Sequence, residues 1–131
     1  MRRIKYRGIS NDTGKWLVGS LVPNGKTAYI APFGELFHLE EVNPGTVGEF
    51  TGMLDKNGKE IYENDIVRYY DDVEDELVVR PVEYLNDYCA FCAVHPQKDP
   101  DGLFAQWQYE VIGNIHDTPE LLKGGNDEER L

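Results

Sequence analysis

Short apolar segments separated by turn-forming residues constrain the fold of this chain more than any other feature. Residues 3–7 alternate polar and apolar side chains, the period of two that is typical of a half-buried β-strand. Further segments rich in Val, Ile, Tyr and Phe are bounded by Gly, Pro, Asn or Asp: 15–22, 27–30, 46–51, 65–70, 77–84, 88–94 and 109–115. Many short strands at this spacing predict a mainly β fold, a barrel or a sandwich, rather than a parallel sheet with helices.

Turn and helix signals are consistent with that class. Asn24-Gly25 predicts a tight hairpin between residues 15–22 and 27–30, because Asn and Gly tolerate the positive φ of such turns. Residues 35–42 fit a short helix and a strand equally well. Thr118 can cap a helix that starts with Pro119, so we expect one short C-terminal helix that ends at Gly124-Gly125.

Length and charge limit the function classes. The 131 residues fit one domain. The formal net charge of −11 repels a phosphate backbone, which disfavours nucleic acid as a partner even though basic residues gather near the N-terminus. No segment approaches the roughly 20 apolar residues of a membrane helix. Two cysteines are too few for a disulfide-rich scaffold, so we expect a cytoplasmic protein.

Two motifs resemble parts of metal sites, but each lacks the further ligands or the loop geometry that such a site needs. Cys89, Cys92 and His95 would need a fourth ligand to hold zinc, and a strand here would place the two sulfurs on opposite faces. Residues 55–60 resemble the start of a calcium loop, but Gly58 comes too early and strands flank it. Phosphate-binding glycine loops and nucleophile motifs are absent from the sequence. We therefore expect no enzyme activity, no cofactor, no metal and no small-molecule ligand.

Three segments together resemble the YopX-like proteins of phages and prophages: residues 47–67, residues 109–115 continuing into 118–122, and residues 4–8. The family usually has Gly where this chain has Asn64, and an aromatic residue where it has His116. The resemblance implies a small SH3-like barrel with long turns, and it supplies no activity and no catalytic residues. We expect a single YopX-like β domain over residues 1–125, followed by a frayed charged tail at 126–131, and the host cytoplasm as its compartment if a phage encodes it.

The middle segment also has a structural interpretation of its own. Asp55, Asn57 and Gly58 predict a turn with positive φ at Gly58. A second turn follows at Asn64 and Asp65, because Asn is the next most tolerant residue of left-handed geometry. Two sharp turns in succession are what the corner of a small barrel needs, so we expect these five residues to be structural.

Two hypotheses for function follow. The first is a non-enzymatic module that assembles with itself or binds a protein partner. The alternative is a role linked to nucleic acid, either by binding through the N-terminal basic cluster or by acting as an acidic mimic of DNA. A strand at 3–7 would place Arg3, Lys5 and Arg7 on one outward face, with Ile4 and Tyr6 inward. Most aromatic side chains must fill the core of so small a domain, and Tyr70 and Trp107 are the ones we expect on a partner surface.

Overall fold

A computed structural model describes residues 3–35, 37–103 and 107–127. The fold is mainly β, with two antiparallel sheets and one short α-helix in the described residues. The residues group into two compact units, Met1–Gly52 and Met53–Leu131. The mainly β class predicted from the sequence is confirmed, whereas the single domain over residues 1–125 stays a prediction.

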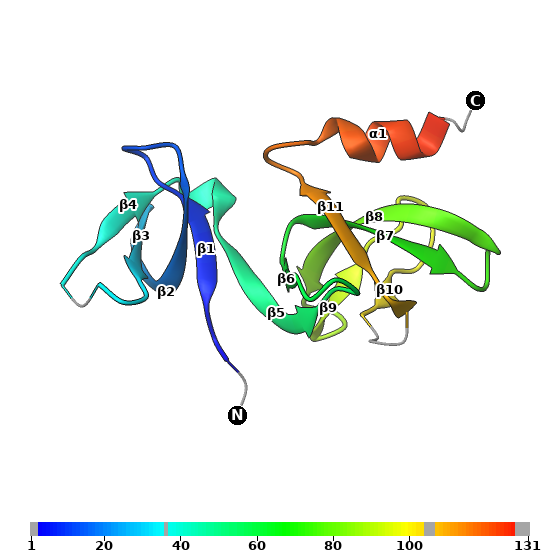
Figure 1. The fold of residues 1–131 in the computed structure, drawn as a ribbon, viewed down its shortest axis with the longest axis horizontal. Coiled ribbons are helices and arrows are strands. Elements are labelled where there is room, and N and C mark those ends of the chain that lie inside the picture. Colours follow the sequence, from blue (N-terminus) through cyan, green and yellow to red (C-terminus); the bar gives the residue numbers. More distant parts are fainter. Residues whose placement is uncertain (1–2, 36, 104–106, 128–131) are drawn as a thin grey trace. The chain divides into compact units, whose positions relative to one another are not determined.

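The first unit contains most of an antiparallel sheet whose strand order is β4-β3-β2-β1-β5-β6, and β6 follows in the second unit (Figure 1). Its elements are β1 Tyr6–Ile9, β2 Trp16–Asn24, β3 Thr27–Pro32, β4 Glu40–Val42, the 3₁₀-helix η1 Pro44–Thr46 and the first part of β5 Gly48–Leu54. Asn24 pairs with Thr27 around a two-residue loop in which Gly25 has φ 63°, which confirms the predicted hairpin. Ala28, Ile30 and Val42 form the buried core of this unit.

The alternation expected at the N-terminus is wrong at two positions. Lys5 is 6% exposed and Ile4 is 59% exposed, the reverse of the predicted arrangement. The strand begins only at Tyr6, and the ammonium of Lys5 lies 5.0 Å from the centre of the Phe50 ring. The half-buried guanidinium of Arg7 lies 4.7 Å from the Trp16 ring centre. Arg3, Lys5 and Arg7 therefore do not form an outward row of cations.

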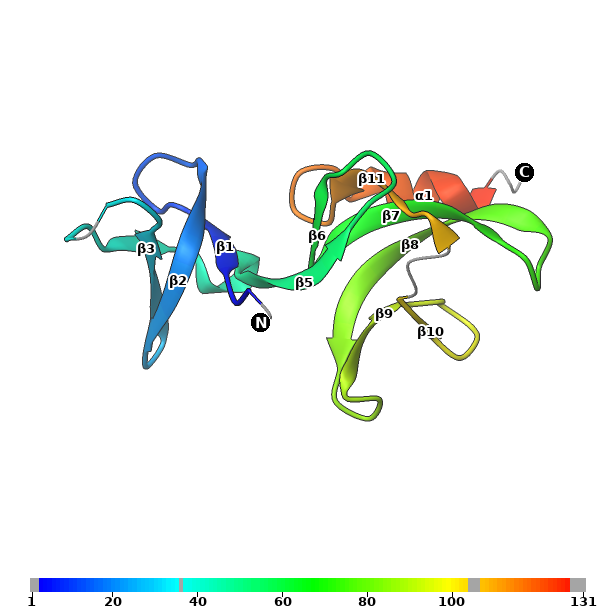
Figure 2. The ribbon, with the colours of Figure 1, turned by 60° about the horizontal axis from the view of Figure 1, so that its bottom comes forward.

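The second unit contains a sheet with the strand order β10-β9-β8-β7-β11. Its elements are the end of β5, β6 Glu60–Tyr62, β7 Asp65–Asp71, β8 Glu76–Leu85, β9 Ala90–Ala93, β10 Asp101–Gly102, β11 Glu110–Asn114 and α1 Glu120–Asp127. The long strand β8 pairs with β7 up to Pro81 and with β9 from Val82 onward, and Figure 2 shows it strongly curved. The core of this unit consists of Ile61, Val67, Tyr69, Val78, Val82, Ala93 and Tyr109.

Several element bounds differ from the sequence prediction. Of residues 35–42, Glu40–Val42 form strand β4. Strand β9 starts at Ala90 because Cys89 has φ 51° and belongs to the preceding turn. Helix α1 runs through Gly124-Gly125 to Asp127, since glycine lowers helix propensity by about 1 kcal/mol but adopts helical angles freely. The predicted tail thus begins inside the helix, and its residues 128–131 lie outside the described residues.

Candidate functional site

The buried carboxylate of Asp55 ties a tight turn to strand β11. Its Oδ1 accepts the backbone N–H of Asn57 at 2.8 Å and that of Lys59 at 2.9 Å, and its Oδ2 accepts the N–H of Val111 at 3.0 Å. Burial opposes ionisation of Asp55, but these three donors outweigh it and hold the pKa of the carboxyl below its usual value. Asp55 therefore fixes where β11 starts relative to the 55–59 turn.

Gly58 closes this turn at φ 84°, as the sequence predicts, and its N–H donates to the Asp55 carbonyl at 3.0 Å. An added Cβ would meet no atom within 4 Å, so any cost of a side chain comes from the backbone angle alone. We expect Gly58→Val to lower the free energy of unfolding by ~1–3 kcal/mol, because a β-branched residue is strained at positive φ. Gly58→Asn is the matched control and should cost less than half as much. Equal denaturant midpoints for Gly58→Val and the wild type would contradict this account of the turn.

The second predicted turn, at Asn64 and Asp65, joins three strands. Asn64 takes φ 75°, so asparagine does replace a glycine in left-handed geometry. Its N–H donates to the Val82 carbonyl at 2.6 Å, and its carbonyl accepts the N–H of Ile115 at 3.0 Å. The Asp65 carboxylate accepts the N–H of Tyr62 at 2.8 Å. These contacts give Asn64 and Asp65 a structural role in the second unit.

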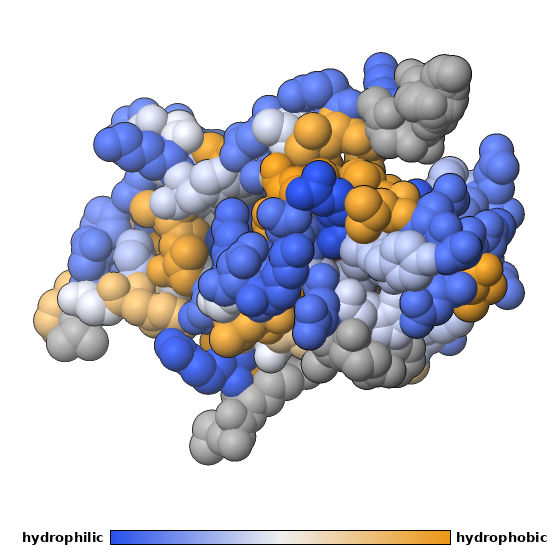
Figure 3. All heavy atoms as spheres, turned by 45° about the vertical axis from the view of Figure 1, so that its right-hand side comes forward, coloured by the Kyte–Doolittle hydropathy of each residue, from blue (hydrophilic) through white to orange (hydrophobic). Residues whose placement is uncertain are grey.

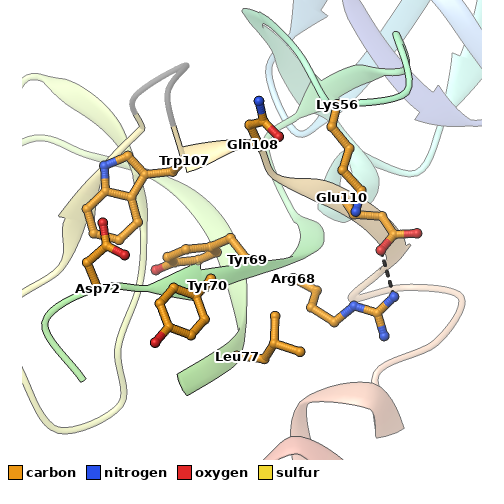
Figure 4. A pocket seen from close by; sticks show the side chains of 9 residues that line it. All are labelled: Lys56, Arg68, Tyr69, Tyr70, Asp72, Leu77, Trp107, Gln108 and Glu110. Atoms are coloured by element: carbon orange, nitrogen blue, oxygen red, sulfur yellow. Dashed lines mark hydrogen bonds and ion pairs between the residues drawn. The ribbon is translucent and has the colours of Figure 1, made fainter. Parts of the chain in front are cut away.

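An open groove of about 320 Å³ lies on the second unit, beside the strands that these turns position. Figure 4 shows the nine side chains that line it: Lys56, Arg68, Tyr69, Tyr70, Asp72, Leu77, Trp107, Gln108 and Glu110. The groove brings together Tyr70 and Trp107, the two aromatic residues that the sequence analysis selected for a partner surface. It is the candidate functional site.

The alternation of side chains along β7 builds the floor of the groove. Val67 and Tyr69 are buried, while Arg68 and Tyr70 are exposed on the opposite face. Across the strands, Glu110 of β11 is paired with Arg68, and Leu77 of β8 is paired with Tyr70. Arg68 Nη2 donates to Glu110 Oε1 at 2.6 Å, which closes one end of the groove with an ion pair.

The groove is open because β11 pairs with only part of β7. Pairing begins at Glu110, opposite Arg68, whereas β7 continues to Asp71. Gln108 has φ 52°, so the chain before β11 turns away from the line of the strand. In the described residues, Tyr70 therefore has a strand partner on the β8 side and none on the β11 side.

Tyr69 supports the Trp107 side of the groove, on the face of β7 opposite to Tyr70. Its ring lies 5.5 Å from the Trp107 ring and 4.9 Å from the Tyr109 ring, both edge to face. Its hydroxyl donates to Asp101 Oδ2 at 3.0 Å. Burial, with the nearby Asp101 carboxylate, raises the pKa of Tyr69 far above its usual value, so the hydroxyl remains a donor. Trp107 thus packs against a side chain that is itself anchored.

Charges of both signs balance in the lining. Lys56 and Arg68 are the cations, and Asp72 and Glu110 are the carboxylates. The hydrogen bond from Arg68 holds the pKa of Glu110 below its usual value, so that the Glu110 carboxyl stays ionised at neutral pH. A lining of this composition has no net charge to attract a polyanion.

Of the residues that line the groove, only Tyr70 and Trp107 were predicted from the sequence as parts of a partner surface. The sequence did not predict the other lining residues, among them Lys56, Asp72, Leu77, Gln108 and Glu110. One signal was available for Arg68: it lies two positions from Tyr70 on a predicted strand, so the two side chains share a face. The other selected residues, Arg3, Lys5 and Arg7, belong to the first unit. The register of β11 against β7, which places Glu110 opposite Arg68, carries no local sequence signal.

The described ranges contain no cluster of three or more His, Cys, Asp or Glu side chains that could hold a metal ion. Cys89 is exposed, Cys92 is buried, and both are free thiols. Burial, followed by the charge of Asp101, raises the pKa of the Cys92 thiol, which disfavours its reactive thiolate form.

The model of the family described as YopX protein matches residues 5–123 of this chain. The chain belongs to the YopX protein family. The groove and both structural turns lie within the matched residues, so they are parts of the YopX domain and not of an appended segment. No curated protein matches the chain.

One solved structure similar to this YopX-family chain is that of protein EF1440 from Enterococcus faecalis. The two share 19% sequence identity with a TM-score of 0.55, over 93% of this chain and 99% of that one. At this identity the likeness concerns the fold alone. In the part of the chain that the structure describes, none of the helices combines the length and the apolar character needed to cross a bilayer.

Proposed function

We propose that this YopX-family protein is a non-enzymatic module that binds a protein partner through the groove on its second unit. One observation carries the proposal: Tyr70 is 45% exposed on a strand face, in the same groove as the half-buried Trp107, where β7 extends beyond its partner β11. An exposed aromatic side chain at an open sheet edge is typical of surfaces that recognise peptides.

The charge of the groove favours a protein over a nucleic acid. Two carboxylates offset the two cations of the lining, and the whole chain has a formal net charge of −11. Counterion release, which supplies most non-specific affinity for nucleic acid, needs a surplus of cations that this groove lacks. The alternative, a role linked to nucleic acid, therefore has less support.

We also propose that the second unit is an SH3-like barrel. The support is its strand order, β10-β9-β8-β7-β11, and the curvature of β8, which pairs with β7 along one half and with β9 along the other. A strand shared in this way turns a sheet back on itself, which is the first step toward closing a barrel. We propose further that the protein comes from a phage or prophage. We also propose that it lies in the cytoplasm, which its two free cysteines support.

Self-association is the other form of partner binding that we propose. It is supported by exposed apolar side chains near β4 in the first unit: Phe33 is 50% exposed, Phe37 is 101% exposed and Leu39 is 52% exposed. Figure 3 shows apolar residues as separate patches among hydrophilic ones on the face in view. Sedimentation velocity at micromolar protein distinguishes an oligomer of this chain from a monomer that binds another protein.

Selection from a displayed library of random peptides tests the proposed function. We expect the wild-type protein to enrich a set of peptides, and Tyr70→Ala to bind them at least about tenfold more weakly, because the exposed ring supplies the apolar contact. Tyr88→Ala is the matched control, since Tyr88 is 51% exposed on the same unit but outside the groove. It should retain full binding.

Two results would contradict this function. The first is a library selection in which the enriched peptides bind Tyr70→Ala as tightly as the wild type. The second is tight binding of a labelled oligonucleotide with a steep salt dependence, which would favour the nucleic-acid alternative.

A further inference from the structure

We infer that a segment of the protein partner binds in the groove as an added β-strand, antiparallel to β7 and hydrogen-bonded to the backbone of Tyr70. A lysine or arginine of this segment then lies beside Asp72. The inference rests on the proposed function and specifies how the partner is recognised. It follows from the direction of the backbone groups along β7, the exposed side chains on its outer face and the charge of Asp72.

Strand β11 directs the backbone groups of successive residues alternately away from β7 and toward it. The Tyr109 carbonyl accepts the N–H of Lys56 at 2.8 Å, and the N–H of Val111 donates to Asp55 Oδ2 at 3.0 Å. Tyr109 and Val111 therefore direct these groups away from β7. Because the direction alternates along an antiparallel strand, Glu110 between them directs its own N–H and carbonyl toward β7.

The same alternation places the backbone groups of Tyr70 at the open edge of β7. Glu110 is paired with Arg68, so Arg68 and, two positions later, Tyr70 direct their groups toward the β11 side. Strand β8 gives the same result: the Pro81 carbonyl is bonded on the β9 side, so its pair Ile66 also faces away from β8. Within the described ranges, no residue bonds to the Tyr70 N–H or carbonyl on the β11 side. Both groups are therefore open to an added strand.

The side chains around Tyr70 suit an apolar residue at the paired position of that strand. Tyr70 is 45% exposed, and Leu77, its cross-strand neighbour on β8, is 67% exposed. In an antiparallel pair of this type, one residue exchanges both hydrogen bonds with Tyr70, and its side chain continues the row of Leu77 and Tyr70. Aromatic and β-branched side chains pack best beside a tyrosine in such a row. We therefore expect valine, isoleucine or an aromatic residue there.

The charges at the two ends of the groove determine where a basic residue fits. Figure 4 shows Tyr70 between Asp72 and the Arg68–Glu110 ion pair. Asp72 is exposed and forms no ion pair with another described residue. In an antiparallel strand, the side chain beside Asp72 belongs to the residue two positions before the apolar one. The segment therefore has a lysine or arginine, then any residue, then the apolar residue.

Fluorescence anisotropy with labelled peptides of about eight residues tests the inference. The probe has Lys-Thr-Val at its centre, flanked by serine and threonine, and a control of equal composition has Val-Thr-Lys instead. Two further versions of the probe carry a backbone N-methyl group, one on the valine and one on the central threonine. A labelled oligothymidine serves as the nucleic-acid probe.

We expect methylation of the valine to weaken the probe at least about tenfold, because it removes the donor to Tyr70 and blocks the pairing. Methylation of the central threonine should change the affinity by less than about twofold, since that N–H points away from β7. The reversed control should bind at least about threefold more weakly, because it loses the ion pair with Asp72.

A pair of protein variants tests the charge. Asp72→Asn should weaken the probe by about threefold, the size of one exposed ion pair. Asp87→Asn removes an exposed carboxylate outside the groove and should have no effect. The contribution of Asp72 should shrink as the salt concentration rises.

The inference fails if the probe does not bind, if its two methylated versions bind alike, or if Asp72→Asn and Asp87→Asn behave alike. A dimer in sedimentation velocity that Tyr70→Ala dissociates would also overturn it, because a second copy would then be the occupant. The proposed function is judged separately, by whether the peptides selected from the random library depend on Tyr70. Selected peptides that depend on Tyr70 but tolerate N-methylation at every position would overturn the inference and leave the proposed function standing. Preference for the oligothymidine over every peptide would overturn both.

Discussion

Replacing Asp55 with alanine is expected to lower the free energy of unfolding by about 3 kcal/mol. The side chain is 7% exposed and accepts three backbone N–H groups, from Asn57, Lys59 and Val111. Alanine would leave these donors without their acceptor in a region that water reaches poorly, which costs more than the bonds themselves contribute. The start of β11 would loosen with it, and the groove beside Glu110 would lose part of its wall.

Urea unfolding followed by circular dichroism measures this effect. Asp87→Ala is the control, because it removes an exposed aspartate and should change stability by no more than about 0.5 kcal/mol. The lowered pKa of Asp55 adds a pH dependence. The stabilisation by the ionised Asp55 carboxylate is complete above the ordinary pKa of 3.8 and is lost as the pH falls through the lower pKa of the folded protein. The difference in unfolding free energy between the wild type and Asp55→Ala should therefore narrow in acid. A constant difference across that range would contradict the assigned role.

Gly19→Ala is expected to destabilise the first unit by about 3 kcal/mol. A Cβ at Gly19 would lie 2.0 Å from the carbonyl oxygen of Ala31 on the neighbouring strand β3, so the backbone of β2 or β3 must shift. Gly45→Ala is the matched control, because its Cβ would meet only Asn43 Oδ1, at 3.4 Å. Unchanged thermal and urea midpoints for Gly19→Ala would show that the two strands do not approach so closely.

The same variant tests whether residues 1–125 fold as one domain. Trp16 belongs to the first compact unit and Trp107 to the second, and the chain has no other tryptophan. Trp16→Phe and Trp107→Phe each leave a single fluorescent reporter, on the second and the first unit respectively. A single domain requires both reporters to shift together when Gly19 is replaced. A shift confined to Trp16 would show two domains that unfold independently.

Local patterns in the sequence were sufficient to predict much of the fold. The hairpin at Asn24-Gly25 and the positive φ of Gly58 and Asn64 follow from residue types that tolerate such angles. The prediction for Lys5, in contrast, was wrong. Its period-two position predicts exposure, but its stem is buried and its ammonium lies over Phe50, a residue far along the chain. Contacts of that kind depend on tertiary packing, which no local pattern encodes.

In the candidate site too, single residues could be predicted from local sequence, whereas their arrangement could not. Tyr70 and Trp107 could be selected because polar neighbours flank them in the sequence. That both line one groove depends on the register of β11, which the Asp55–Val111 hydrogen bond helps to fix across 56 positions of sequence. The charge balance of the groove likewise depends on Glu110 meeting Arg68 across 42 positions. These long-range pairings are what the sequence alone did not reveal.

Hydrogen exchange, with and without a peptide selected on the wild-type protein, tests the central claim most directly. If the groove binds a partner segment, added peptide should slow amide exchange at residues 69–72 and 107–110, where β7 extends beyond β11. The Tyr70→Ala variant should show no such protection at the same peptide concentration. Protection confined to segments outside the groove, or equal protection in wild type and Tyr70→Ala, would contradict the account.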